Sequence, residues 1–303
     1  MYNIDSQLRF ITLNCLFLIE GGLVLTAMRY ACIAAYILSA IHCLAASKEV
    51  SIKTIQGTKR SVVPIVCGYL NEQKQFQVVE VAGSGFFVDI LGRFVTAGHV
   101  LDNWDKISTE KHACFPAIYI PDHGWGRYEQ NIPFHSFAFV SCVRDSTVDL
   151  AVCQPGENPF KSPKVPNGII APVSFDTQEW PDGTPIAFTG FPLEYVFPVT
   201  SKGFIAGHMA SSGSDLAFDY IIDKAAWPGA SGSLVYLSNG KVIGIIRLRG
   251  QNEGVGLAYA RSASVIVDFL AKHPATVSDQ KQTQNPITRN VPAKSLRITQ
   301  PEQ

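Results

Sequence analysis

The chain has 303 residues, of which 47% are hydrophobic and 17% charged, so it can bury a large core. Its 25 basic and 25 acidic residues leave no formal net charge, which disfavours nucleic acid or another polyanion as a partner. The seven cysteines form no C-x-x-C pair and show no metal-ligand spacing with the histidines. We therefore expect no zinc site, no thioredoxin-like motif and no metal or other cofactor.

The N-terminal stretch is mostly apolar, and two interpretations of it are open. In one, residues 10–27 and 31–46 are membrane segments, although Glu20 interrupts the first and the second is short for a span. In the other, which we favour, translation begins at Met28 and a signal peptide ends at Leu44-Ala45-Ala46. Either interpretation predicts a periplasmic, secreted or membrane-anchored protein whose folded part lies outside the cytoplasm.

Beyond about Ser51, short β-rich runs alternate with glycine and proline, and no helix-length periodic segment occurs before residue 262. This pattern predicts an all-β sandwich or barrel. Residues 102–134 read as loops with one short strand, and a final helix begins at Ser262 or Ser264 and stops before Pro274. The predicted strands are 61–69, 77–81, 85–89, 93–96, 117–120, 136–143, 150–153, 186–189, 203–206, 218–222, 233–237, 242–247 and 256–260.

A proline-rich passage, 155–166, divides the strands into two groups. We expect a targeting or anchoring segment at 1–47, a first β-rich half at 48–160, and a second half with the closing helix at 161–273. Residues 274–303 are polar and are expected to be a disordered tail.

Ser231 stands in the segment Trp227-Pro228-Gly229-Ala230-Ser231-Gly232-Ser233-Leu234. A serine hydroxyl becomes a good nucleophile only when a base takes its proton and donors stabilise the oxyanion that it creates. Flanking glycines let backbone N–H groups converge on one point. Because small residues also make ordinary turns before strands, the interpretation depends on a base and an acid elsewhere.

Two further positions supply such groups. His99 follows the β-branched run 94–97, and Asp149 stands at the mouth of the apolar run 150–153. Burial beside an apolar run suits an acid that orients a histidine, whereas the competing Asp145 lies in a more polar part of the turn.

The order His99, Asp149, Ser231, each in its own strand-rich motif, resembles the trypsin-like (chymotrypsin-fold) serine peptidases. Within that group, the chain most resembles the Deg/HtrA-type protease domain over about residues 60–270. The motifs that carry the resemblance are GSGFFV at 83–88, VTAGHV at 95–100, DLAV at 149–152, PGASGSLV at 228–235, GKVIGI at 240–245 and VGLAYA at 255–260.

The resemblance implies two packed antiparallel six-stranded β-barrels with a C-terminal helix, and a serine endopeptidase acting on polypeptides. Ser231 would be the nucleophile, His99 its base and Asp149 the orienting acid. The N–H groups of Gly229 and Ser231 would form the oxyanion hole. The alternative is a catalytically silent relative that binds peptides in the same cleft.

Departures from the family pattern modify these expectations. Ala230 replaces the aspartate that in many relatives pairs with a new N-terminus, so we expect no activation by chain cleavage. Some thirty polar residues follow the closing helix, so we expect no PDZ domain. Ser233 replaces a common glycine and should be tolerated.

By similarity, the base of the primary substrate pocket lies near Ala225 and its wall near Arg247 and Arg249. Ala225 offers no acid for a basic substrate residue, so an apolar residue is the default. An acidic preference would follow if Arg249 pointed inward, but we favour solvated side chains for both arginines.

Four cysteines, Cys67, Cys114, Cys142 and Cys153, fall in the folded part and permit two disulfides. Cys142 and Cys153 flank a short turn, where they would face each other across a hairpin. For this pair we favour buried free thiols.

Overall fold

The computed structural model describes residues 49–70, 72, 76–102, 112–119, 134–137, 139–195, 197–210, 218–247 and 256–275. These residues belong to one compact unit that begins at Glu49. The expectations for residues 1–47 and for the tail beyond residue 275 lie outside the described residues, as does Arg249. No helix within the described ranges is both long and apolar enough to cross a membrane.

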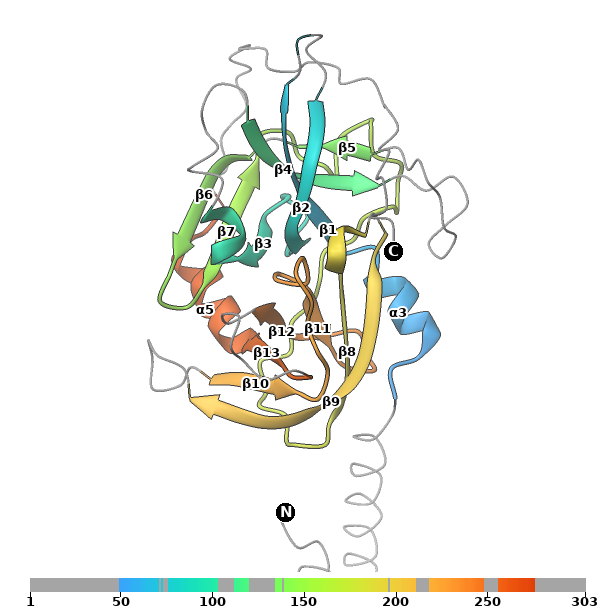
Figure 1. The fold of residues 1–303 in the computed structure, drawn as a ribbon, viewed down its shortest axis with the longest axis vertical. Helices are drawn as coiled ribbons and strands as arrows, with labels where there is room; N and C mark the ends of the chain where they lie inside the picture. Colours follow the sequence, from blue (N-terminus) through green and yellow to red (C-terminus); the bar gives the residue numbers. More distant parts are fainter. Residues whose placement is uncertain are drawn as a thin grey trace, which may run out of the picture. The chain divides into compact units, whose positions relative to one another are not determined.

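The N-terminal half forms an antiparallel sheet of seven strands, called here the first sheet, in the order β5-β4-β1-β2-β3-β7-β6. In Figure 1 these strands occupy the upper part of the view. The strands are β1 (Val62–Leu70), β2 (Phe76–Phe87), β3 (Phe94–Ala97), β4 (His112–Tyr119), β5 (Phe134–Ser136), β6 (Phe139–Asp145) and β7 (Leu150–Pro155).

The first sheet differs in detail from the expected six strands. The two short strands predicted around residue 83 are one strand, β2, because register shifts in its pairing with β1 absorb the irregular glycine-rich stretch. Strand β4 begins earlier than predicted and runs through Pro116, which lies opposite Ile65. The proline was therefore wrongly read as a strand boundary.

The C-terminal half forms a closed barrel of six strands in the order β10-β13-β12-β11-β8-β9, as the resemblance implies. Its strands gather in the lower part of Figure 1. They are β8 (Pro185–Gly190), β9 (Val199–Ala210), β10 (Phe218–Ile222), β11 (Leu234–Tyr236), β12 (Val242–Arg247) and β13 (Ala258–Ser262).

Two α-helices flank these sheets in the described part of the chain, and only the second was predicted. The helix α3 (Ile52–Thr58) begins at Ser51, whose hydroxyl accepts a hydrogen bond from Thr54 N at 3.1 Å. It escaped prediction because it is a short helix whose β-branched residues and glycine have low helix propensity. The helix α5 (Ala263–Lys272) follows Ser262 as expected, but the Ser262 hydroxyl bonds the Ser264 hydroxyl instead of a backbone N–H.

The apolar core has three parts. One fills the first sheet, one fills the barrel, and the largest lies between sheet, barrel and α5. The last contains side chains such as Phe86 and Leu150 from the sheet, Leu234 and Ile245 from the barrel, and Phe269 from α5. This shared core fixes how the two halves meet, and with them any site at their boundary.

Both cysteine pairs are disulfide-bonded, Cys67 to Cys114 and Cys142 to Cys153. The expectation of free thiols was therefore wrong. The reason is register: each pair occupies directly opposite positions on neighbouring antiparallel strands, with Cα atoms 4.1 Å apart in both cases. Composition and parity do not reveal such cross-strand pairing.

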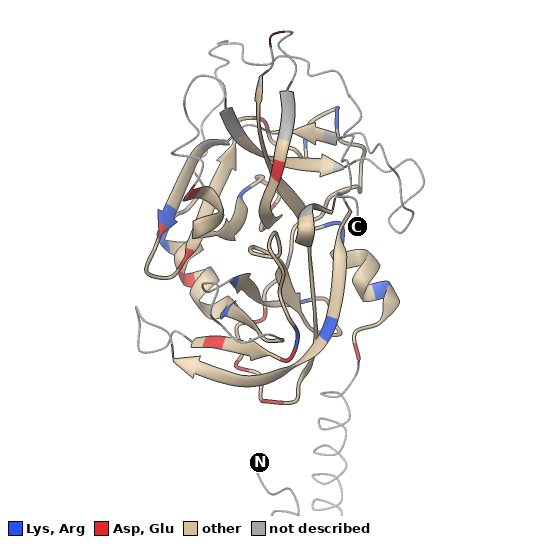
Figure 2. Ribbon diagram, viewed as in Figure 1, with Lys and Arg blue, Asp and Glu red and all other residues tan. Residues whose placement is uncertain are grey.

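Charged side chains are few and scattered along the described ribbon (Figure 2). This distribution agrees with the balanced charge of the sequence. The most informative charges are therefore individual ones inside the fold.

Candidate active site

Residues 228–233, called here the serine turn, carry Ser231 in a tight turn between β10 and β11 that packs on the first sheet. Gly229 and Gly232 have φ values of +85° and +86°, which side chains adopt at a cost. A Cβ at Gly232 would collide with the backbone oxygen of Ser84. The glycines therefore let the turn approach β2 closely.

His99 lies in the 3₁₀ turn η1 (Gly98–Leu101), directly after β3. Gly98 N donates to Asp149 O at 2.9 Å, and a Cβ on Gly98 would lie 3.2 Å from Asp149 Oδ1. His99 N donates to the same Oδ1 at 2.9 Å. The small residue before His99 thus brings its backbone against the carboxylate.

Asp149 occupies the turn between β6 and β7 with φ of +53°, a left-handed conformation that aspartate tolerates better than most residues. The competing Asp145 accepts a hydrogen bond from Thr147 N at 2.8 Å and so stabilises the turn. Burial on its own would raise the pKa of the Asp149 carboxyl. Hydrogen bonds from His99 and the charges of His99 and Arg247 together lower that pKa below its usual value.

The three predicted residues meet at the boundary between sheet and barrel. His99 Nδ1 lies 3.0 Å from Asp149 Oδ2 and 3.1 Å from Oδ1, and His99 Nε2 lies 2.9 Å from Ser231 Oγ. Both pairs are within hydrogen-bond reach, as the motif order predicted. The arrangement can move a proton from the serine hydroxyl to the imidazole while the carboxylate holds the far side of the ring.

Two backbone N–H groups in the serine turn have no acceptor among the described residues, those of Gly229 and Ser231. Their neighbours are bonded: Ala230 N donates to Trp227 O at 2.8 Å, and Gly232 N donates to Ile246 O at 2.9 Å. Unpaired donors in a turn next to a serine are suited to bind an oxyanion.

Ser84 holds this turn from the first sheet. Its N–H donates to Ser231 O at 2.8 Å, and its hydroxyl donates to Gly229 O at 2.9 Å while accepting from Phe191 N at 2.9 Å. Ser84 is fully buried. The sequence indicated only a closely packed GSG motif here, so this role of the side chain was missed.

Leu193 holds the turn from the barrel side. Its N–H donates to Pro228 O at 2.7 Å, and its φ of +52° is unusual for leucine. No local sequence signal marks this contact. Leu193 and Ser84 thus bind the consecutive carbonyl groups of Pro228 and Gly229.

The residues proposed for the substrate pocket lie in different surroundings. Ala225 is half-buried in the segment that joins β10 to the serine turn. Arg247 is 9% exposed and ion-paired with Asp149 and Asp219, so the expectation of a solvated side chain was wrong. The Arg247 guanidinium pairs with these two carboxylates because this residue, at the end of β12, is buried.

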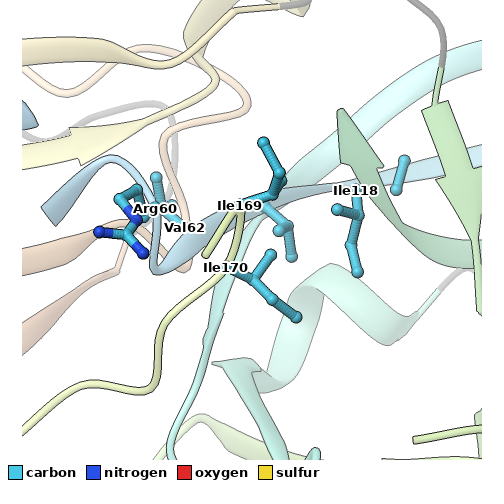
Figure 3. A pocket seen from close by; sticks show the side chains of 7 residues that line it. Arg60, Val62, Ile118, Ile169 and Ile170 are labelled. Carbon is cyan, nitrogen blue, oxygen red and sulfur yellow. The ribbon is translucent and has the colours of Figure 1, made fainter. Parts of the chain in front are cut away.

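A small pocket lies elsewhere, on the first sheet. Figure 3 shows Ile118, Ile169 and Ile170 around it, with Arg60 and Val62 beside them; Val63 and Ala117 complete the lining. This lining contains no nucleophile, acid or histidine, so the pocket offers no chemistry for catalysis.

The fold and the geometry around Ser231 define a chymotrypsin-fold serine peptidase. A family model described as the trypsin-like peptidase domain matches residues 83–245, more than half of the chain, and the chain belongs to that family. The match spans all three residues His99, Asp149 and Ser231. A search of curated proteins gives no match.

Solved structures resemble the chain in fold. Deg5 aligns with a TM-score of 0.50 and 20% identity, over 72% of this chain and 90% of that one. Rv3671c from M. tuberculosis H37Rv, in an inactive serine-to-alanine form, aligns with a TM-score of 0.48 and 18% identity over 76% and 94% of the two chains. At these identities the likeness concerns the fold alone.

Proposed function

We propose that this chain is a serine endopeptidase that hydrolyses peptide bonds through Ser231, His99 and Asp149. The observation that carries the proposal is the continuous contact from Asp149 through His99 to Ser231, with distances of 3.0 and 2.9 Å. Each member comes from a different turn, and the contacts join residues 50 and 132 positions apart. Such an arrangement has a clear chemical use and little structural one.

In the proposed reaction, Ser231 Oγ attacks the scissile carbonyl as His99 Nε2 takes the hydroxyl proton. The imidazolium then returns that proton to the leaving amine, which leaves an ester between Ser231 and the acyl part. A water, deprotonated by His99, attacks this ester and frees the acid and the serine. Asp149 holds the imidazole and stabilises its positive charge throughout.

We assign the oxyanion hole to the N–H groups of Gly229 and Ser231. Loss of one such donor typically raises the barrier by about 3 kcal/mol, so the direction of both N–H groups contributes to catalysis. The support is that both donors are unoccupied within the described part of the chain, whereas Ser84 and Leu193 occupy the carbonyl groups around them. The turn is thus ready to bind an anion.

The site is proposed to form without an activating cut. Ala230 is 2% exposed and packs in the barrel core. It stands where many relatives have an aspartate that pairs with a new N-terminus, and an alanine side chain cannot form that pair. Ala225 offers no acid for a basic substrate side chain, which supports an apolar residue before the scissile bond. A digest of a peptide library would contradict this preference if cleavage occurred mainly after Lys or Arg.

An oxidising location outside the cytoplasm is proposed for the catalytic part, periplasmic, secreted or membrane-anchored. The two disulfides support it, because such bonds persist in oxidising compartments. The apolar N-terminal sequence is the second support. Sequencing the N-terminus of the mature protein would decide between a cleaved signal near Ala46 and a retained anchor.

A fluorophosphonate probe tests the enzyme against its alternative, a silent peptide-binding relative. We expect the wild type to be labelled and to cleave an unfolded protein, and both properties to disappear in Ser231→Ala. Ser141→Ala, an exposed serine on β6, is the matched control and should behave like the wild type. A folded wild-type protein that binds peptides but resists the probe would favour the alternative, which the intact contacts among the three residues do not support.

A further inference from the structure

Four charged side chains form a buried row that ends at the proposed triad. Arg247 Nε donates to Asp149 Oδ2 at 3.2 Å, and Arg247 Nη1 donates to Asp219 Oδ2 at 2.9 Å. Arg261 Nε lies 3.1 Å from Asp219 Oδ1. Asp219 and Arg261 are fully buried, and the side chain of Arg247 is 10% exposed.

The signs of these charges alternate along the row, so the four groups together are neutral. Burying an ion is costly unless an opposite charge and hydrogen bonds compensate it. Asp219 is held on one side by Arg247 and on the other by Arg261, its register partner across β10 and β13. This pairing places Asp219 so that it fixes the direction of the Arg247 fork.

We propose that Arg247 is a positioning residue that holds Asp149 from the barrel while His99 holds it from the first sheet. The inference rests on the proposed function. His99 and Asp149 belong to turns of the first sheet, and Arg247 ends strand β12 of the barrel. The ion pair between Arg247 and Asp149 therefore crosses the boundary that the triad itself crosses.

The geometry gives this contact a mechanical role. Asp149 Oδ1 accepts from the His99 backbone, and Oδ2 accepts from Arg247, so both carboxylate oxygens are tied. A carboxylate fixed at both oxygens cannot rotate, and the imidazole that it holds stays directed at Ser231. The planar guanidinium donates in two fixed directions to two carboxylates, which a flexible lysine ammonium does not reproduce.

This role replaces the pocket role suggested for Arg247 by similarity. Its charge is engaged by two carboxylates, and little of its surface reaches solvent. It is therefore a poor partner for an acidic substrate side chain. The contribution of the Arg247 charge to the lowered pKa of Asp149 agrees with the contact.

Arg247→Gln in the full chain tests the inference, with Arg247→Lys and Arg93→Gln beside it. Arg93 is a suitable control because it too is an ion-paired arginine, with its side chain 20% exposed, and it bonds carbonyl groups at the end of α5. For Arg247→Gln we expect kcat to fall about 10- to 100-fold with KM changed less than about 3-fold, as for a small misplacement of reacting groups. Arg247→Lys should lie between, and Arg93→Gln should lower the Tm but not kcat.

A spectroscopic readout separates positioning from stability. The proton between His99 Nδ1 and Asp149 should give a far-downfield NMR signal in the wild type and in Arg93→Gln, and a shifted or broadened one in Arg247→Gln. If Arg247→Gln does not fold, the comparison of Arg247→Lys with the wild type decides. Wild-type kcat and an unchanged signal in the Arg247 variants would overturn the inference, as would an effect confined to KM for substrates with acidic residues.

Failure of the proposed function gives a different result. In that case the wild type itself resists the fluorophosphonate probe and cleaves nothing. The downfield signal and its response to Arg247→Gln still report whether Arg247 positions Asp149. An unchanged signal then refutes the positioning role separately.

Discussion

Of the two disulfides, the one that contributes more to stability should contribute less to activity. Cys67–Cys114 closes a sequence separation of 47 residues and Cys142–Cys153 one of 11. The entropy that a cross-link removes from the unfolded chain grows with the logarithm of loop length. The longer bridge should therefore stabilise the fold by about 4 kcal/mol and the shorter one by about 3 kcal/mol. Double alanine variants of each pair should lose these amounts of unfolding free energy.

The shorter bridge has the larger predicted effect on catalysis. It joins β6 to β7, the strands on either side of the turn that carries Asp149, whereas the longer bridge joins β1 to β4, which β2 separates from the strand β3 that precedes His99. We therefore expect the Cys142/Cys153 variant to lose about tenfold in kcat through misplacement of the acid, and the Cys67/Cys114 variant to keep its kcat.

Urea unfolding at fixed pH and initial rates on one peptide substrate measure both quantities on the same preparations. Each variant serves as the control of the other, since both remove one bridge and two sulfur atoms. The reasoning is refuted if the Cys142/Cys153 variant is the less stable of the two. It is also refuted if that variant retains full kcat.

Three further predictions concern single residues. Gly232→Ala should lower the free energy of unfolding by about 2 kcal/mol or more and should lower kcat, because the added Cβ meets Ser84 O at a residue with positive φ. Gly183→Ala is the control: its φ is +83° with open space around it, so it should lower the free energy of unfolding by only about 1 kcal/mol and leave kcat unchanged. The lowered pKa of Asp149 stabilises the fold above about pH 4, and this contribution is lost as pH falls through the folded-state value, so unfolding free energy should fall less steeply in acid for Asp149→Asn than for the wild type. Burial raises the pKa of Tyr220 to about 12, so the protonated phenol contributes to the free energy of unfolding below about pH 10, and this contribution is lost on going to pH 12. In denaturant titrations, Tyr220→Phe should therefore lose less unfolding free energy than the wild type over this alkaline range.

The sequence was informative where the relevant signal is local. His99, Asp149 and Ser231 each stand at the edge of an apolar run, and the order of these runs identified the fold. It also predicted that His99 lies within hydrogen-bond distance of Asp149 and Ser231, as the structure has it. Strands β10 and β12 were predicted to the residue because their apolar runs end at clear breaks. Within these motifs, chemistry and local structure agree.

What the sequence did not reveal depends on pairing over long distances. Arg247 contacts Asp149 across 98 positions, and Ser84 contacts Gly229 across 145. Neither contact leaves a mark in local periodicity, since an arginine at a strand end usually reaches solvent and a serine between glycines usually makes a turn. The cysteine pairs were misjudged for the same reason, because register across strands decides which sulfur atoms meet.

The contacts of Ser84 also bear on the order of events during synthesis. Ser84 belongs to β2 and is synthesised before Ser231, and the carbonyl groups Gly229 O and Ser231 O of the serine turn both accept hydrogen bonds from it in the folded chain. On the proposed mechanism, a nascent or partly folded chain contains the nucleophile without a formed oxyanion hole.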